Sequence, residues 1–132
     1  MKNKALVVID LQNDITKNYK RIIGQVNKVI DWAMSNDMHV VYIRHYKLSE
    51  KTRTFKPDTK GSEDEFYITG ADATACVKST SYNLVKAGYK VHVISDCVTS
   101  YDLKKMDEML KYYADKGCEV LTLEECMMEK EA

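Results

Sequence analysis

The chain alternates between short apolar runs and segments in which apolar residues recur at helical spacing. Five runs have the length and the β-branched content of buried strands: Ala5–Ile9, Val40–Ile43, Glu65–Thr69, Val91–Ile94 and Val120–Leu123. Between them, apolar residues recur every three or four positions over 22–34, 77–85 and 103–113, which predicts three helices. Gly88 and Gly117 follow the second and third of these segments, as C-terminal helix caps often do.

This alternation predicts an α/β fold. The strand-like runs are continuously apolar rather than two-sided, which is typical of a parallel sheet covered by helices on both faces. We therefore expect a single three-layer, Rossmann-like domain over residues 1–132, ending in a polar tail, 124–132, that is either helical or frayed. One connection does not fit. Residues 46–65 form a long, highly charged loop without a helical stripe, which marks either a functional segment or a missing element.

Composition narrows the function classes. The 132 residues suit one domain, and 20 basic residues balance 20 acidic ones, so no net charge attracts nucleic acid or a membrane surface. No apolar run is long enough for a membrane span, and no secretion signal opens the sequence. The four cysteines do not have zinc-module spacing. We expect a cytoplasmic protein with reduced thiols and with neither metal nor cofactor.

Ligands of open parallel sheets bind beyond the carboxyl ends of the strands, and three polar features are predicted there. Asp10 ends the first strand, the segment 70–76 joins the third strand to its helix, and Asp96 ends the fourth strand. A carboxylate in the position of Asp10 is partly desolvated and suits a general base. The alternative interpretation is that Asp10 caps the following segment.

Cys76 lies in the first turn of a predicted helix, after a glycine-containing loop. Backbone N–H groups and the helix dipole stabilise a thiolate there, and the same N–H groups can bind an oxyanion. The alternative is a small buried apolar residue, which describes most cysteines outside disulfides. Cys97 is interpreted as structural, and Cys118 and Cys126 as packing residues or surface thiols.

The histidines add little to this interpretation. His39 and His92, beside or within strands, are interpreted as structural, whereas His45 follows the second strand on the ligand side. No two histidines share one helical face, so we expect no metal site.

Four segments together resemble one family. They are Ala5-Leu-Val-Val-Ile-Asp-Leu-Gln-Asn-Asp14, Phe55-Lys-Pro-Asp-Thr-Lys-Gly-Ser-Glu63, Ile68-Thr-Gly-Ala-Asp-Ala-Thr-Ala-Cys-Val77 and Tyr89-Lys-Val-His-Val-Ile-Ser-Asp-Cys97. In this order they resemble the isochorismatase-like cysteine hydrolases, the superfamily that includes nicotinamidases. The second segment is similar to that family's F-x-P-G-T-x-G-x-E motif, although Asp58 stands where the family has glycine.

The resemblance implies a role for each matching residue. Cys76 corresponds to the nucleophile and Asp10 to the acid/base that takes the thiol proton. A non-proline cis peptide in the nucleophile loop would fall at Ala71–Asp72, and the Cys76 N–H would be one oxyanion donor. The family's activity implies hydrolysis of a small amide, or of a related C–N or C–O bond, in a small-molecule substrate through a covalent intermediate. Family members are typically homo-oligomers.

The sequence departs from the family in one place. In the family, the segment matching Phe55–Glu63 is followed by a further strand and helix, and that strand carries a catalytic lysine. Here Glu63 is followed directly by the third predicted strand, so this block is missing. The resulting shortened isochorismatase-like fold has a mostly parallel five-stranded sheet in the order 2-1-3-4-5. Loss of the lysine leaves Asp10 facing a Cys76 thiolate, two like charges that weaken the nucleophile.

The missing lysine leaves alternatives for the function. Lys56 and Lys60, on the long loop, are candidate substitutes, with solvated loop lysines as the alternative interpretation, and His45 is a further candidate. One function is therefore a cysteine hydrolase; the other is a weak or inactive shortened relative that serves as a small-molecule or protein binding scaffold. A flavodoxin-like or receiver-like domain ranks last, because its phosphate loop or acidic cluster is not seen. Loss of the edge strand exposes Val40–Ile43, which predicts a homo-oligomer.

Overall fold

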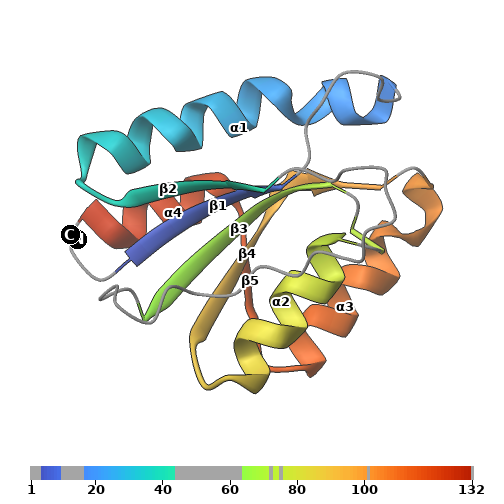
Figure 1. Ribbon diagram of the computed structural model, residues 1–132. Helices are drawn as coiled ribbons and strands as arrows, with labels where there is room; N and C mark the ends of the chain where they lie inside the picture. The colour runs from blue at the N-terminus through green and yellow to red at the C-terminus, as the bar shows by residue number, and fades with distance from the viewer. Residues whose placement is uncertain are drawn as a thin grey trace.

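The computed structural model describes residues 4–9, 17–43, 64–71, 73–74, 76–100 and 102–131. These residues build one five-stranded sheet in the order β2-β1-β3-β4-β5, with every neighbouring pair parallel (Figure 1). The predicted strand order is confirmed, and the sheet is fully parallel rather than mostly so. The strands are β1 (Lys4–Ile9), β2 (His39–Ile43), β3 (Glu65–Ala71), β4 (Lys90–Thr99) and β5 (Glu119–Leu121).

Four α-helices cover the two faces of the sheet (Figure 1). On one face lie α1 (Lys17–Ser35) and α4 (Leu123–Glu131); on the other lie α2 (Cys76–Lys86) and α3 (Met106–Asp115), with a short 3₁₀ turn, η1 (Leu103–Lys105), leading into α3. Within the described part of the chain, each helix is too short or too polar to span a lipid bilayer.

The strands β1, β3, β4 and β5 contribute side chains to two separate cores, one on each face, whereas the edge strand β2 contributes only Val40, to the core under α1 and α4. In β1, Val7 and Ile9 join the core under α2 and α3, while Leu6 and Val8 join the core under α1 and α4. Successive side chains of a strand point to opposite faces, so a strand buried on both sides must be apolar at every position. This explains why the strands appear in the sequence as continuous apolar runs.

The longest departure from the predicted boundaries is in β4, which continues to Thr99 instead of ending near Ile94. Its pairing with β3 shifts, because Ile68 pairs with Val93 whereas Gly70 pairs with Val98. The extra residues of β4 form an irregularity of the bulge type, after which the strand rejoins the sheet. The bulge contains polar residues, which interrupt the apolar run, so the sequence pattern does not predict that β4 continues beyond it.

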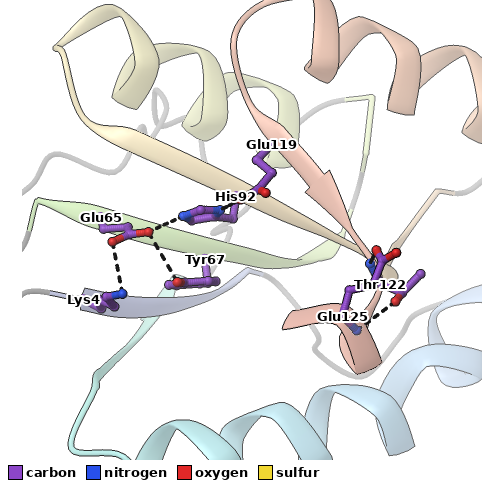
Figure 2. Close-up of polar contacts among 7 residues, drawn as sticks. All are labelled: Lys4, Glu65, Tyr67, His92, Glu119, Thr122 and Glu125. Atoms are coloured by element: carbon purple, nitrogen blue, oxygen red, sulfur yellow. Dashed lines mark hydrogen bonds and ion pairs between the residues drawn. The ribbon is translucent and has the colours of Figure 1, made fainter. Parts of the chain in front are cut away.

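The predicted fifth strand and polar tail have a different boundary in the structure. The strand ends at Leu121, and Leu123 is already the first residue of α4. Thr122 and Glu125 form reciprocal bonds at the helix start: the Glu125 N–H donates to Thr122 Oγ1 (3.1 Å) and the Thr122 N–H to Glu125 Oε1 (2.9 Å; Figure 2). This capping box specifies the helix. The predicted charged loop, 46–65, lies outside the described residues up to 63.

Candidate active site

The carboxyl ends of β1 and β3 lie side by side. Ile9, the last residue of β1, pairs with Gly70 of β3. Gly70 has a φ of +114°, and a Cβ atom placed on it would lie 2.1 Å from the Ile9 carbonyl oxygen. Only glycine allows this backbone conformation and this approach. β1 and β3 therefore end at neighbouring positions of the sheet.

The loop between β3 and α2 is attached to the fold through both backbone polar groups of Ala73. The Ala73 N–H donates to the carbonyl oxygen of Thr99, the last residue of β4, at 2.9 Å. The Tyr113 hydroxyl of α3 donates to the Ala73 carbonyl oxygen at 2.5 Å. Ala73 and Tyr113 are both buried in the core under α2 and α3. Two elements distant in sequence thus fix this loop.

Cys76 is the first residue of α2 and is half-buried against the same core. The helix is fixed on the sheet by its buried face, which includes Val77, Thr80 and Leu84. The partial positive charge at a helix N-terminus favours a thiolate over a thiol. The predicted position of Cys76 in the first turn of a helix is confirmed, whereas Gly70, expected in the preceding loop, lies within β3.

The other three cysteines differ from Cys76 in their environment. All four are thiols rather than disulfides, and Cys97, Cys118 and Cys126 are buried. Burial is the main reason that the pKa of the Cys97 thiol is raised, with the Asp96 carboxylate adding to the effect. Burial also raises the pKa of Cys118 to about 11. Cys76 is thus the most accessible thiol of the four, and of the two interpretations of Cys118 and Cys126 the structure supports packing residues over surface thiols.

Two of the predicted site residues are among those described: β3 ends at Ala71 and α2 begins at Cys76, so they flank one loop. Their roles in the site stay predictions. Asp10, Asp72, Lys56, Lys60 and His45 lie outside the described residues.

Asp96 does not end its strand and belongs to a different region from the loop before Cys76. Its carboxylate accepts from Gln25 Nε2 of α1 (3.1 Å) and from the backbone N–H of Leu123 (2.7 Å). It therefore joins α1 to the start of α4, on the face of the sheet opposite to α2. The carboxylate lies at the N-terminus of α4, where a free backbone N–H and the helix dipole favour a negative charge, which is a structural role.

A row of polar side chains lies at the opposite end of the sheet, where the strands begin (Figure 2). Glu65 of β3 lies 3.3 Å from Lys4 Nζ, contacts His92 Nε2 and accepts from the Tyr67 hydroxyl at 3.4 Å. His92 Nδ1 faces Glu119 Oε1 at 2.5 Å, and its ring stacks on Tyr67. We refer to Lys4, Glu65, Tyr67, His92 and Glu119 as the amino-end cluster.

The amino-end cluster has the features of a structural network. His92 is only 1% exposed, in agreement with its structural interpretation. Burial alone would raise the pKa of Glu65, but the hydrogen bond and charge of His92, together with Lys4, hold it below its usual range. The two ring nitrogens of His92 face different carboxylates, so the ligands do not converge on one point. Among the described residues, no group of three or more His, Cys, Asp or Glu side chains is placed to hold a metal ion.

Tyr113 and Thr99 are the site residues that sequence reasoning did not find. Tyr113 lies on the apolar stripe of its helix and looks like an ordinary core residue. Only its hydroxyl group could have indicated a polar contact from the sequence, because a buried tyrosine hydroxyl usually has a hydrogen-bond partner. Thr99 contributes a backbone carbonyl, which no side-chain pattern reports.

A parallel sheet covered by helices, with a cysteine at the first helical position after the central strand β3, defines a class of α/β proteins. Comparison with known families shows to which family of that class the chain belongs. The isochorismatase domain model matches residues 4–65 and 59–125, nearly the whole chain. The chain belongs to the isochorismatase family, and the predicted family membership is confirmed.

Individual relatives agree with this assignment. Isochorismatase family protein 2A of Dictyostelium discoideum is 25% identical over an alignment of 125 residues, which covers 87% of this chain and 62% of that protein. The chain therefore spans about three fifths of the length of this curated relative. Among solved structures, an isochorismatase-like hydrolase from Alkaliphilus metalliredigens superposes with a TM-score of 0.81 at 21% identity, covering 98% of this chain and 99% of the other. The MAR1 ribonuclease of Caenorhabditis elegans superposes with a TM-score of 0.77 at 23% sequence identity. This match covers 96% of this chain and 80% of the ribonuclease chain.

Proposed function

We propose that this chain is a cysteine hydrolase that acts on a small amide, or on a related C–N or C–O bond, through a covalent intermediate on Cys76. One observation supports the proposal: Cys76 is half-buried at the first position of α2, the helix that follows β3, and β3 ends at the level where its neighbour β1 ends. Asp10 directly follows β1, so its carboxylate is the proposed acid/base. Family membership supports hydrolysis, and the motif resemblance supports these two roles.

In the proposed mechanism, Asp10 takes the proton of the Cys76 thiol, and the sulfur attacks the carbonyl carbon of the substrate. A C–S bond forms, and the carbonyl electron pair moves to the oxygen, which the Cys76 N–H stabilises. Collapse of this intermediate breaks the C–N or C–O bond, and Asp10 returns the proton to the leaving group. Water then attacks the thioester with Asp10 as general base, releasing the acid and restoring the thiol.

A lysine from the long loop, Lys56 or Lys60, is proposed to replace the family's catalytic lysine. The family match falls into two segments that meet at residues 59–65, which supports an internal deletion near this point. A cation beside Asp10 would keep the carboxylate ionised and favour the thiolate.

The test of this function is an assay of purified chain against a panel of small substrates. Nicotinamide, isochorismate and short aliphatic amides represent the family chemistry, and RNA serves as the probe for a ribonuclease. Cys76→Ala and Asp10→Asn are each expected to reduce any turnover to background. Catalytic residues that act as one unit are not additive, so replacing any one of them removes nearly all of the activity. Cys118→Ala, which removes a buried thiol, is the matched control and should retain activity. Hydrolysis that survives Cys76→Ala would rule out the covalent mechanism.

Chemical labelling tests the thiol without a substrate. Limited alkylation with iodoacetamide at pH 8 should modify Cys76 first. A thiol with a pKa of about 11, such as Cys118, is only ~0.1% thiolate at that pH and is also buried. Peptide mapping by mass spectrometry gives the order of modification. Labelling of Cys118 or Cys126 with Cys76 untouched would contradict the proposal.

We also propose that the chain forms a homo-oligomer through β2. This strand is at one edge of the sheet, and its Tyr42 side chain is 65% exposed. An edge strand with apolar side chains is a template for pairing with another chain. Sedimentation at micromolar concentration should give a species larger than the monomer, and Tyr42→Lys should shift it toward the monomer. A monomer with rapidly exchanging Val40–Ile43 amides would contradict this.

A further inference from the structure

We propose that Tyr113 is a positioning residue for the nucleophile: its hydroxyl sets the path of the loop that presents Cys76. This inference rests on the proposed function and adds a residue of α3 to it. The loop and α3 are distant in sequence, and the Tyr113 hydroxyl joins them by donating to the Ala73 carbonyl oxygen at 2.5 Å.

The position of the Tyr113 hydroxyl is itself fixed by packing. The residue is 1% exposed and belongs to the core under α2 and α3, together with Val77 and Leu84 of α2. A buried aromatic ring in a packed core has little rotational freedom. The hydroxyl therefore acts as a rigid donor rather than as an adjustable surface group, and the loop must place a carbonyl at that point.

Holding the Ala73 carbonyl fixes the plane of the peptide that joins Ala73 to Thr74, because the peptide group is planar. The Ala73 N–H is fixed separately by Thr99 at 2.9 Å. With both polar groups held, Ala73 has little freedom in either backbone dihedral. Cys76 follows three residues later, so the direction in which the loop enters α2 depends on this anchor.

The two contacts of Ala73 are not equivalent for an experiment. The contact with Thr99 joins two backbone groups, so a side-chain substitution leaves it in place. The contact with Tyr113 depends on one hydroxyl oxygen and can be removed alone. Tyr113→Phe keeps the ring and its packing, and leaves the Ala73 carbonyl without this donor. The bond from the Ala73 N–H to the Thr99 carbonyl oxygen is unaffected by this substitution.

The experiment compares Tyr113→Phe with Tyr112→Phe. Tyr112 is the neighbouring tyrosine of α3 and is half-buried, and its ring lies beneath the ammonium groups of Lys78 and Lys116. The first readout is the alkylation rate of Cys76 by iodoacetamide between pH 6 and 9. The second is kcat and KM for whichever panel substrate the wild type hydrolyses. Thermal unfolding of each variant monitors stability.

For Tyr113→Phe we expect kcat to fall about tenfold with KM within about twofold, because misplacing a reacting group by a fraction of an ångström reduces the rate rather than binding. The alkylation profile of Cys76 should change in rate or in midpoint. Tyr112→Phe should match the wild type in both. If Tyr113→Phe unfolds too readily, the same comparison is made in the Gly24→Ala background, in which an exposed glycine of α1 is replaced on the far face of the sheet.

The outcomes separate the two proposals. If Cys76 of the wild type is not the preferred thiol and no substrate is turned over, the proposed function fails. If Cys76 is preferred but Tyr113→Phe leaves its alkylation profile and kcat unchanged, the function stands and the role of Tyr113 is overturned. An equal loss in Tyr113→Phe and Tyr112→Phe also overturns it, since it would reflect the stability of α3.

Discussion

At the carboxyl end of the sheet, the loop before Cys76 is held by neutral groups, whereas at the amino end the strands are joined by charged side chains. The neutral contacts are those of Ala73 with Thr99 and Tyr113, and the close approach of Gly70 to Ile9. The charged contacts are those of Lys4, Glu65, His92 and Glu119. The first region lies on the α2 side of the sheet and the second on the α1 side.

This difference suits the two regions to different tasks. Hydrogen bonds between neutral backbone groups and a hydroxyl do not depend on a charge, so the loop would keep its geometry during the proton transfer proposed between Cys76 and Asp10. Buried ion pairs depend on the protonation of both partners, so the amino-end cluster makes stability depend on pH. The predictions below test this division.

The largest effect is expected from Gly70→Ala. The added Cβ would meet the Ile9 carbonyl at 2.1 Å, and the positive φ adds strain. Because the three nearest atoms are all backbone atoms of Ile9 in the interior strand β1, they cannot move aside. We expect a loss of at least about 3 kcal/mol in the free energy of unfolding, or failure to fold. Urea denaturation gives the value.

Two other glycines provide matched controls for Gly70. Gly88 also has a positive φ, +95°, but a Cβ there would have nothing within 4 Å. Gly88→Ala should therefore cost only about 1 kcal/mol, from backbone strain alone. Gly24 lies inside α1, and a Cβ placed on it would also have nothing within 4 Å. Gly24→Ala should therefore raise the free energy of unfolding by about 1 kcal/mol, because alanine is the better helix former. A Gly70→Ala effect no larger than that of Gly88→Ala would contradict the close-approach argument.

A smaller effect, with a distinct pH dependence, is expected at the amino end from Glu65→Gln. At pH 7 the variant should lose about 2 kcal/mol in the free energy of unfolding, because the buried His92 then lacks one of its two carboxylate partners and keeps only Glu119. The pKa of Glu65 is lowered from 4.5 in the folded protein. Its contribution is therefore complete above about pH 4.5 and is lost as the pH falls further. The stability difference between wild type and variant, measured by urea unfolding, should shrink below that pH.

Lys4→Met provides the control for this pH effect. Lys4 contacts the same carboxylate at 3.3 Å, but its side chain is 24% exposed. A partly exposed ion pair contributes little, so we expect a loss of about 0.5 kcal/mol. A Glu65→Gln difference that stays constant from pH 7 down to pH 3 would show that the charge of Glu65 does not contribute.

Much of this architecture was predictable because it depends on local pattern. The five apolar runs and the three helical stripes lie where the strands and the first three helices form, and the parallel arrangement follows from strands that are apolar at every position. The helix α4 was also encoded, in the capping box of Thr122 and Glu125, but its low amphipathicity left it indistinct. The extension of β4 was not predictable, because its bulge interrupts the apolar pattern at Ser95 and Asp96.

The sequence by itself determined the order of the elements, the family and the placement of Cys76 at a helix start, because each depends on residues close together in the chain. Only the tertiary structure decided which distant groups meet. The hydroxyl of Tyr113 reaches Ala73 across 40 positions, and the carboxylate of Asp96 joins α1 to α4 instead of facing a ligand. Glu65, an ordinary first residue of a strand in the sequence, becomes a buried partner of His92. Such contacts depend on how the helices pack on the sheet, so they cannot be predicted from the periodicity of apolar residues along the chain.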